Sequence, residues 1–281
     1  MIKVMISYPN AKINLGLHVI NKRDDGFHNI ETVFYPINFS DMLECIENKA
    51  YAKNNKCVFV QHGLHISGNI DTNLVVRAYK LLDKEFDLPP VLVHLNKLLP
   101  MGAGLGGGSS DAAYMLKMLN KLFDLNLDTT SLESRAAVLG SDCSFFIQNK
   151  PAYLFGKGHE LEPFDLSLTG KYLVLVNTGA HSNTAIAYKY AKRREVFNEE
   201  QSLKKVIKLP IESWKENLVN DFELSVFESI PELKEVKSWL YKQGATYAAM
   251  SGSGASMLGL FDEVPKLEGK WSKYVVYKDW L

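Results

Sequence analysis

The chain has 281 residues, 46% of them hydrophobic and 23% charged, which is typical of globular proteins; at roughly 150 residues per domain, the length predicts two domains. Its 32 basic and 32 acidic side chains cancel, which argues against a nucleic-acid binder that works through phosphate contacts. Three scattered cysteines, Cys45, Cys57 and Cys143, form no C-x-x-C pair and indicate free thiols in a reducing compartment. With no leader peptide and no apolar run near about 18 residues, we expect a cytoplasmic protein without a membrane partner.

The N-terminal part of the chain shows the two-residue period of half-buried strands. Strands are expected over 3–8, 11–20, 32–38 and 42–46, with a turn at Asp24-Asp25-Gly26. Apolar residues at helical spacing predict a helix over 73–86. A strand over 91–95 then leads into a segment rich in glycine.

The clearest helix is expected over 109–123, where apolar residues fall on one face. Ser109 or Ser110 is expected to cap its N-terminus. The next helix carries the capping-box pattern of Thr130 and Glu133, and Gly140 suits its C-terminal end.

A domain boundary is expected at Lys150-Pro151. Beyond it, the expected strands are 172–176, 246–250, 257–261 and 274–277, and the expected helices are 184–195, 213–228 and 231–243. This mixed order predicts an α+β fold and not a regular βαβ array.

The glycine-rich segment is the strongest functional signal. Five glycines fall within positions 102–108, directly before a helix. Glycine lets backbone N–H groups approach a ligand closely, and a helix N-terminus adds partial positive charge and free donors. The segment is therefore predicted to bind phosphate groups, with the hydroxyls of Ser109 and Ser110 available to phosphate or to Mg²⁺.

Three other interpretations of this segment are weaker. A Walker A loop requires Lys after its last glycine, where Ser109 stands. Gly102, Gly104 and Gly107 satisfy G-x-G-x-x-G, but several residues, including Pro100, separate them from the preceding strand. A flexible loop without a ligand would rarely lead straight into an amphipathic helix.

Two further places carry candidate chemistry. On a strand, Lys12 and Asn14 point to the same face, which is either a site or a solvent-facing surface. Asp142 follows a helix end and precedes an apolar run, where its carboxylate either accepts a proton or caps a turn. Spacing alone favours the solvent-facing surface and the cap.

Together these segments resemble the GHMP kinase superfamily, which combines an N-terminal motif, a glycine- and serine-rich ATP loop and a late glycine-rich motif. The late motif here is S-G-S-G-A-S over 251–256. Within the superfamily, the likeness is greatest to the branch whose acceptor is a cytidine diphosphate conjugate of methylerythritol. That likeness rests on A-K-I-N-L at 11–15, R-D-D-G-F-H at 23–28, N-L-V-V-R-A at 73–78, L-P-M-G at 99–102 and G-S-D at 140–142.

The resemblance implies a two-domain GHMP kinase fold, with an ATP-binding domain over 1–150 and a C-terminal α/β domain on the substrate side over 151–281. It implies phosphorylation of the 2-hydroxyl of the conjugate by ATP with Mg²⁺, on the non-mevalonate route to isoprenoid precursors, by a monomer or homodimer. It also makes Lys12 and Asp142 the catalytic candidates. Asp142 would be the general base, and Lys12 would keep it ionised and steady the charge on the transferring group.

The resemblance further implies binding residues. His28 would hydrogen-bond the cytosine edge, and Phe27 and Tyr188 would stack on its two faces, with Asn14 and Thr184 near the ligand. The residues expected around ATP are, in chain order, Asn73, Leu74, Lys97, Pro100, Met101, Gly102, Ala103, Gly104, Leu105, Gly106, Gly107, Gly108, Ser109 and Ser110.

The sequence departs from the family pattern in two places. Phe27 stands where Tyr is usual, so a bond from a phenol oxygen is lost while the ring remains. Cys143-Ser144 stand where a small aliphatic residue and Pro are common, which bears on the backbone path after Asp142.

Three rival functions remain to be weighed. A kinase for another alcohol, such as homoserine or mevalonate, would not need the edge-reading His28 beside an aromatic wall. A nucleotide-binding regulatory protein without turnover would not need both Lys12 and Asp142. A nicotinamide dehydrogenase would require the glycine motif to sit directly on a strand end.

Overall fold

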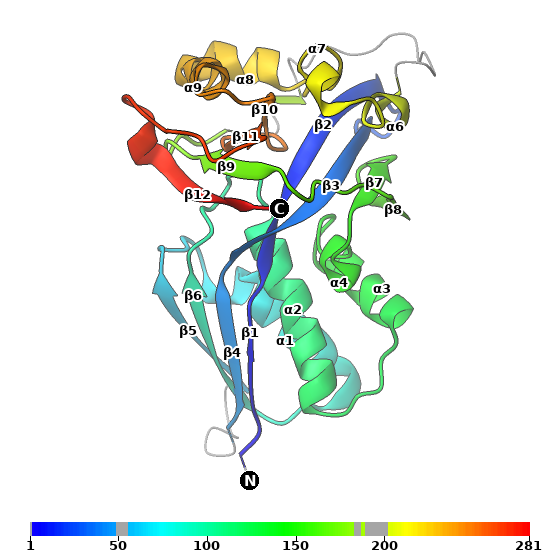
Figure 1. Cartoon of the computed structure of the whole chain (residues 1–281). Coiled ribbons are helices and arrows are strands. Elements are labelled where there is room, and N and C mark those ends of the chain that lie inside the picture. Colours follow the sequence, from blue (N-terminus) through cyan, green and yellow to red (C-terminus); the bar gives the residue numbers. More distant parts are fainter. Residues whose placement is uncertain (1, 49–55, 183–186, 189–201) are drawn as a thin grey trace. The chain divides into compact units, whose positions relative to one another are not determined.

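The computed structural model describes residues 2–48, 56–182, 187–188 and 202–281, and the chain divides into two compact units (Figure 1). Unit 1 consists of Met1–Ala11, Asn38–Met101 and Gly106–Lys150, and unit 2 of Lys12–Ile37, Gly102–Leu105 and Pro151–Leu281. The chain passes from unit 1 to unit 2 at Lys150-Pro151. It also enters unit 2 earlier, at 12–37 and at 102–105, so packing does not follow chain order alone.

A four-stranded sheet forms one layer of unit 1, in the order β1-β4-β6-β5. Its strands are β1 (Val4–Ser7), β4 (Met42–Glu47), β6 (Val91–Lys97) and β5 (Cys57–Gly63). The pairs β1–β4 and β4–β6 are antiparallel, and β5–β6 is parallel. Every second residue of β6 is buried, because one face of the sheet packs against helices while the other does not.

Helices cover that face of the unit 1 sheet (Figure 1). Unit 1 contains η2 (Ile70–Thr72), α1 (Leu74–Phe86), α2 (Gly107–Leu122), α3 (Thr129–Leu139) and α4 (Phe145–Gln148). Helices α1 and α2 pack against each other and against the sheet. Helix α2 begins at Gly107, within the glycine-rich segment.

The helix caps of unit 1 differ from the sequence-based expectation. Helix α2 begins two residues earlier than expected, and its N-cap is Gly106 in the left-handed region, with φ 71°. The cap predicted at Ser109 or Ser110 is therefore wrong. Helix α3 is capped by Asp128, whose carboxylate accepts a 2.8 Å hydrogen bond from the Ser131 N–H, so the box expected from Thr130 does not form the cap. Its C-cap is Gly140, as expected.

Unit 2 contains two four-stranded sheets. The first has the order β2-β3-β7-β8, with β2 (Asn10–Lys22), β3 (His28–Ser40), β7 (Ala152–Phe155) and β8 (Glu160–Pro163). The second has the order β10-β11-β9-β12, with β10 (Tyr247–Met250), β11 (Met257–Phe261), β9 (Tyr172–Val176) and β12 (Val275–Trp280). Strands β5, β7 and β8 were not expected from the sequence.

The helices of unit 2 pack mainly on its second sheet. They are α6 (Leu203–Val206), η4 (Ile211–Ser213), α7 (Trp214–Asn217), α8 (Glu223–Ser229), α9 (Pro231–Lys242) and η5 (Ser272–Tyr274). Side chains of α8 and α9, such as Val226, Val236 and Leu240, join Val174 and Met257 of the sheet in one buried apolar cluster. The mixed helices and strands confirm the predicted α+β class.

The helix expected over 213–228 is interrupted around Asn220. The Asn220 side-chain amide donates hydrogen bonds to the Met250 and Gly252 carbonyls, at 2.9 and 2.8 Å. The backbone on either side of it bonds to Leu17. These bonds hold the chain extended there, so the prediction of one continuous helix is wrong. Apart from residues 187 and 188, the helix expected over 184–195 lies outside the described residues.

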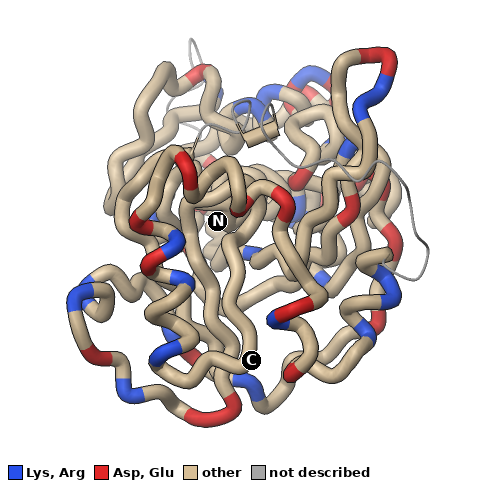
Figure 2. The backbone as a smooth tube through the Cα atoms, turned by 90° about the horizontal axis from the view of Figure 1, so that it is seen from above, with Lys and Arg blue, Asp and Glu red and all other residues tan. Residues whose placement is uncertain are grey.

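Basic and acidic positions are interspersed along the backbone (Figure 2). This agrees with the zero formal net charge. Among the described residues, the structure contains no helix with the length and apolar character needed to cross a bilayer.

Candidate active site

Lys12 lies on β2 in a buried polar cluster of unit 2. Its ammonium donates a 2.5 Å hydrogen bond to Asn14 Oδ1 and a 3.1 Å hydrogen bond to the Gly104 carbonyl. The same ammonium lies 4.1 Å from the centroid of the Phe34 ring. Lys12 is 3% exposed and Asn14 2%, so their strand face is not the solvent-facing surface that spacing alone favoured.

Three segments that are distant in the sequence meet at Gly104. The Ser251 hydroxyl donates a 2.8 Å hydrogen bond to the Gly104 carbonyl and accepts one of 3.1 Å from the Asn14 N–H. Gly104 has φ +74°, and a Cβ at this position would lie 2.0 Å from the Ser251 carbonyl oxygen. Only glycine fits there. The early motif, the glycine loop and the late glycine motif are thus joined within unit 2.

Unit 1 contains a cavity of about 210 Å³ beside the start of α1 and α2. Four residues that the resemblance assigned to ATP line it: Asn73, Leu74, Met101 and Gly108. The other lining residues are Phe59, Gln61, Ile66, Ser67, Gly68, Asn69, Ile70, Thr72 and Asp111. The Asn73 side chain also caps α1 by accepting a 2.9 Å bond from the Val75 N–H, so this wall is fixed by the helix start.

The N-terminus of α2 has the properties of an anion site. The Ser110 N–H bonds to the Gly106 carbonyl at 2.9 Å, so the helical ladder begins there. The N–H groups of Gly107, Gly108 and Ser109 precede that first helical bond. The cap residue Gly106 contributes no side chain. The partial positive charge of the helix start therefore remains available to an anion.

Lys97 is expected near the nucleoside of ATP from the resemblance, and that expectation stays a prediction; the structure shows what its ammonium contacts. Its ammonium is fully buried and contacts Asp41 and Asp111, at 2.5 and 2.7 Å. Lys97 does not line the cavity. A contact of its ammonium with ATP therefore has no support from this arrangement.

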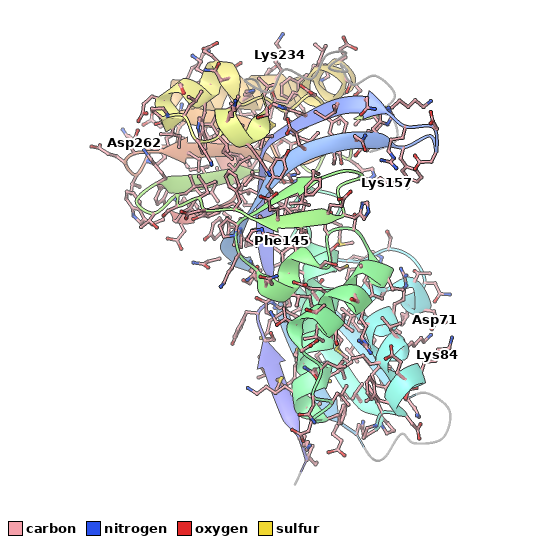
Figure 3. All side chains as sticks on the ribbon, turned by 90° about the vertical axis from the view of Figure 1, so that its right-hand side faces the viewer. Asp71, Lys84, Phe145, Lys157, Lys234 and Asp262 are labelled. Carbon is pink, nitrogen blue, oxygen red and sulfur yellow. The ribbon has the colours of Figure 1, made fainter. Side chains whose placement is uncertain are left out.

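Asp142 lies in the turn between α3 and α4, and Ser141 donates a 3.3 Å hydrogen bond to its carboxylate. Cys143 and Ser144, which depart from the family pattern, directly follow Asp142 in this turn. The Ser144 hydroxyl bonds back to the Glu133 carbonyl of α3 at 3.1 Å. Burial raises the pKa of the Cys143 thiol to about 11, which keeps it neutral. Phe145, labelled in Figure 3, is buried directly after the turn.

The residues expected to bind cytosine lie in unit 2. The rings of His28 and Tyr188 stack with their centroids 5.2 Å apart. The ring of Phe222 packs edge-on against Tyr188, with the two centroids 4.7 Å apart. Phe27 is 63% exposed, and the Lys157 ammonium lies 5.0 Å from its ring centroid. The structure thus brings His28 and Tyr188 together, and Thr184 lies outside the described residues.

Two buried carboxylates that contact Lys97, those of Asp41 and Asp111, were not predicted from the sequence. Asp111 follows the two serines directly, and Asp41 comes just before β4. Both appear as ordinary polar residues in the sequence. The one available signal was an acidic residue immediately after a glycine–serine segment.

Comparisons with known proteins show the family of the chain. The family described as "GHMP kinases N terminal domain" matches residues 73–157, and "GHMP kinases C terminal" matches residues 202–276. The chain is 52% identical to the 4-diphosphocytidyl-2-C-methyl-D-erythritol kinase of Bacteroides fragilis over 264 residues, which cover 94% of each chain. It is 38% identical to the kinase of the same name from Chlorobium chlorochromatii, over 89% of this chain and 86% of that one.

Solved structures are similar as well. A crystal structure of 4-(cytidine 5'-diphospho)-2C-methyl-D-erythritol kinase superposes with a TM-score of 0.74 at 30% identity, covering 91% of this chain and 90% of the other. Mevalonate kinase of Methanococcus jannaschii superposes with a TM-score of 0.68 at 15% identity, covering 92% and 90%. The second likeness supports the fold alone.

The chain therefore belongs to the GHMP kinases, a class of ATP-dependent kinases that act on small molecules. Within that class, it belongs to the family of the 4-diphosphocytidyl-2-C-methyl-D-erythritol kinases.

Replacing Gly104 by alanine should destabilise the chain by at least about 2 kcal/mol, because a Cβ in a left-handed backbone would also collide with the Ser251 carbonyl. Urea unfolding measures this loss. Gly179→Ala is the matched control, since Gly179 has φ +84° but nothing within 4 Å of its Cβ position. Equal losses in the two variants would show that the contact with Ser251 contributes nothing.

Proposed function

We propose that this protein transfers the γ-phosphoryl group of ATP to the 2-hydroxyl of 4-diphosphocytidyl-2-C-methyl-D-erythritol, on the non-mevalonate route to isoprenoid precursors. One observation carries the proposal: the 52% identity to the kinase of that name from Bacteroides fragilis extends over 94% of both chains. A relationship of this extent leaves little room for a different acceptor site.

The rival acceptors have weaker support. Structures of a homoserine kinase and a mevalonate kinase share only 14% and 15% of aligned residues with this chain. Likeness at that level reflects the common fold, and a common fold does not fix the substrate. We therefore base the proposed acceptor on the 4-diphosphocytidyl-2-C-methyl-D-erythritol kinases, to which the chain is 52% identical.

We propose that ATP binds at the glycine segment and the start of α2. A helix N-terminus with a glycine cap favours phosphate groups, and the cavity lined by Leu74, Phe59 and Ile66 offers apolar walls to a base. Mg²⁺ would arrive with the phosphates, because this ion commonly keeps several waters and binds through substrate phosphates. When bound, it would neutralise the negative charge of the phosphates.

We propose Asp142 as the general base and Lys12 as the cation that stabilises the transferring group. Phosphoryl transfer passes through a loose transition state, so positioning and charge stabilisation dominate its catalysis. A buried ammonium held by Asn14 and the Gly104 carbonyl is already oriented, so it would need little reorganisation during the reaction. A carboxylate on the turn after α3 suits proton abstraction from an alcohol.

We propose that His28 and Tyr188 form the cytosine site. Their rings are parallel to within 18°, and the edge contact of Tyr188 with Phe222 fixes one of them. A flat base is recognised by stacking on such rings together with a hydrogen bond to its edge. Phe27 would supply an exposed aromatic face beside them. The cytoplasm is the compartment in which we place the reaction.

The acceptor is tested by ADP release from Mg·ATP with 4-diphosphocytidyl-2-C-methyl-D-erythritol, beside homoserine and mevalonate. We expect turnover with the cytidine compound alone. Turnover with either other alcohol in its place would contradict the proposed substrate while leaving the kinase class intact.

Asp142→Asn should lower turnover by about 10²–10⁴-fold, the usual contribution of general-base catalysis. The Kd of a non-hydrolysable ATP analogue should stay unchanged, because the substitution removes a charge but little volume. Asp124→Asn, at an exposed carboxylate that pairs with Lys3, is the control and should retain turnover. Near-normal turnover of Asp142→Asn would remove this residue from the role of base.

Tyr188→Ala should raise KM for the cytidine substrate by about 5- to 150-fold, since stacking of a base on an aromatic ring is worth about 1–3 kcal/mol. KM for ATP should not change. Tyr188→Phe keeps the ring and should behave like the parent protein. If the alanine variant shows an unchanged KM for the cytidine substrate, Tyr188 does not stack on the base.

A further inference from the structure

Three charged side chains meet in the interior of unit 1, below the start of α2. The Lys97 ammonium donates to Asp41 Oδ2 at 2.5 Å and to Asp111 Oδ2 at 2.7 Å. The side chains of Lys97 and Asp41 are fully buried and that of Asp111 is 2% exposed. Charges buried this deeply persist only when they are paired.

The charge balance of this cluster is uneven, because two carboxylates face one ammonium. Burial opposes the charge on Lys97, but Asp111 and Asp41 outweigh it and raise the pKa of the ammonium above its usual value. Burial, with Asp41 adding to it, raises the pKa of Asp111 to about 7 against the pull of Lys97. Removing one carboxylate therefore leaves a balanced pair, whereas removing Lys97 would leave two buried carboxylates without a counter-ion.

The cluster joins three chain segments that surround the glycine loop. Lys97 ends β6, Asp41 precedes β4, and Asp111 is the fifth residue of α2. The second oxygen of Asp41 accepts hydrogen bonds from the N–H groups of Leu98 and Leu99, at 2.6 and 2.9 Å. Asp41 thus holds both the Lys97 ammonium and the backbone that leaves β6 towards the loop.

The first turn of α2 lies directly against this cluster. A Cβ at Gly107, the first residue of α2, would lie 2.9 Å from the Lys97 ammonium and 3.1 Å from Leu99 Cβ. A larger residue at position 107 would collide with the Lys97 ammonium, and this favours glycine there. A shift of the Lys97 side chain would move the backbone N–H groups that face an anion.

We infer that Lys97, Asp41 and Asp111 form a positioning triad that fixes the first turn of α2 to the end of β6 and thereby sets the affinity for ATP. The inference rests on the proposed ATP site at the start of α2. Lys97 and Asp41 do not line the cavity of unit 1, so they act on the nucleotide through Asp111 and the α2 backbone. The inference adds a positioning role for the Lys97 ammonium to the place near the nucleoside of ATP that the resemblance implies for this residue.

Asp41→Asn tests the inference from the side away from the cavity. An asparagine keeps an oxygen for the Leu98 and Leu99 N–H groups but loses the ionic bond to Lys97, and Lys97 remains paired with Asp111. We expect the Kd of a non-hydrolysable ATP analogue, measured calorimetrically with Mg²⁺, to rise about three- to tenfold. KM for the alcohol substrate should stay unchanged.

The matched control is Asp83→Asn. Asp83 also pairs with a lysine of unit 1, Lys56, at 2.8 Å. It lies on α1 roughly 14 Å along the axis from the cavity-lining Leu74. This variant should bind the ATP analogue like the parent protein. The calorimetric measurement needs no acceptor, so it stands even if the proposed alcohol substrate is wrong.

An unchanged Kd for Asp41→Asn would overturn the inference. A parallel rise in the Kd for the ATP analogue and in KM for the alcohol, with a matching loss in urea unfolding, would also overturn it, because that pattern indicates a general structural role. If Asp41→Asn does not fold, Asp111→Asn carries the same test from the α2 side, with the same expected rise in Kd. An unchanged Kd in that variant overturns the inference equally.

Discussion

The approach of Gly104 to the Ser251 carbonyl is the constraint on which the rest of unit 2's site depends. No side chain fits between these two backbones, and hydrogen bonds join the segments at this point. The Gly104 carbonyl receives both the Ser251 hydroxyl and the Lys12 ammonium. Lys12 therefore has a fixed position because a glycine loop and a late serine hold it there, and its strand alone would not fix the ammonium.

In unit 1, at the other end of the glycine segment, ion pairs between side chains fix the structure. There the first turn of α2 lies against a buried ammonium that two carboxylates hold. The helix start itself carries no capping side chain. A capping side chain whose oxygen accepted hydrogen bonds from the free N–H groups would compete with a phosphate, so a glycine cap without a side chain is consistent with an anion site. The cost of the missing cap is offset by packing of α2 against α1 and the sheet.

The sequence predicted the α+β class and the elements with strong periodicity, including α1, α9, β9 and β11. It also predicted an anion site at the start of a helix. The structure has a helix N-terminus there without a capping side chain, and phosphate binding at this position stays a prediction. It did not predict the break at Asn220, whose cause is a pair of carbonyls thirty and thirty-two residues further along the chain. Tertiary hydrogen bonds of this kind leave no local pattern.

The candidate residues show the same limit. Spacing alone favoured a solvent-facing surface for Lys12 and Asn14, whereas the structure buries both. The resemblance implies that Lys97 lies near the nucleoside of ATP, which stays a prediction, and the structure adds that its ammonium pairs with Asp41 and Asp111. A motif indicates that a residue belongs near a site, but it does not say which of its neighbours the side chain contacts. That information comes from burial and pairing.

Phosphorus NMR of the isolated product shows which hydroxyl of 4-diphosphocytidyl-2-C-methyl-D-erythritol receives the phosphoryl group, and we propose the 2-hydroxyl. The carbon that bears this hydroxyl also bears the methyl group and carries no hydrogen. Transfer to it gives one new phosphomonoester signal without three-bond coupling to a carbinol proton, beside the two signals of the diphosphate. A new signal split by such a coupling would place the phosphate on another hydroxyl and contradict the proposed reaction.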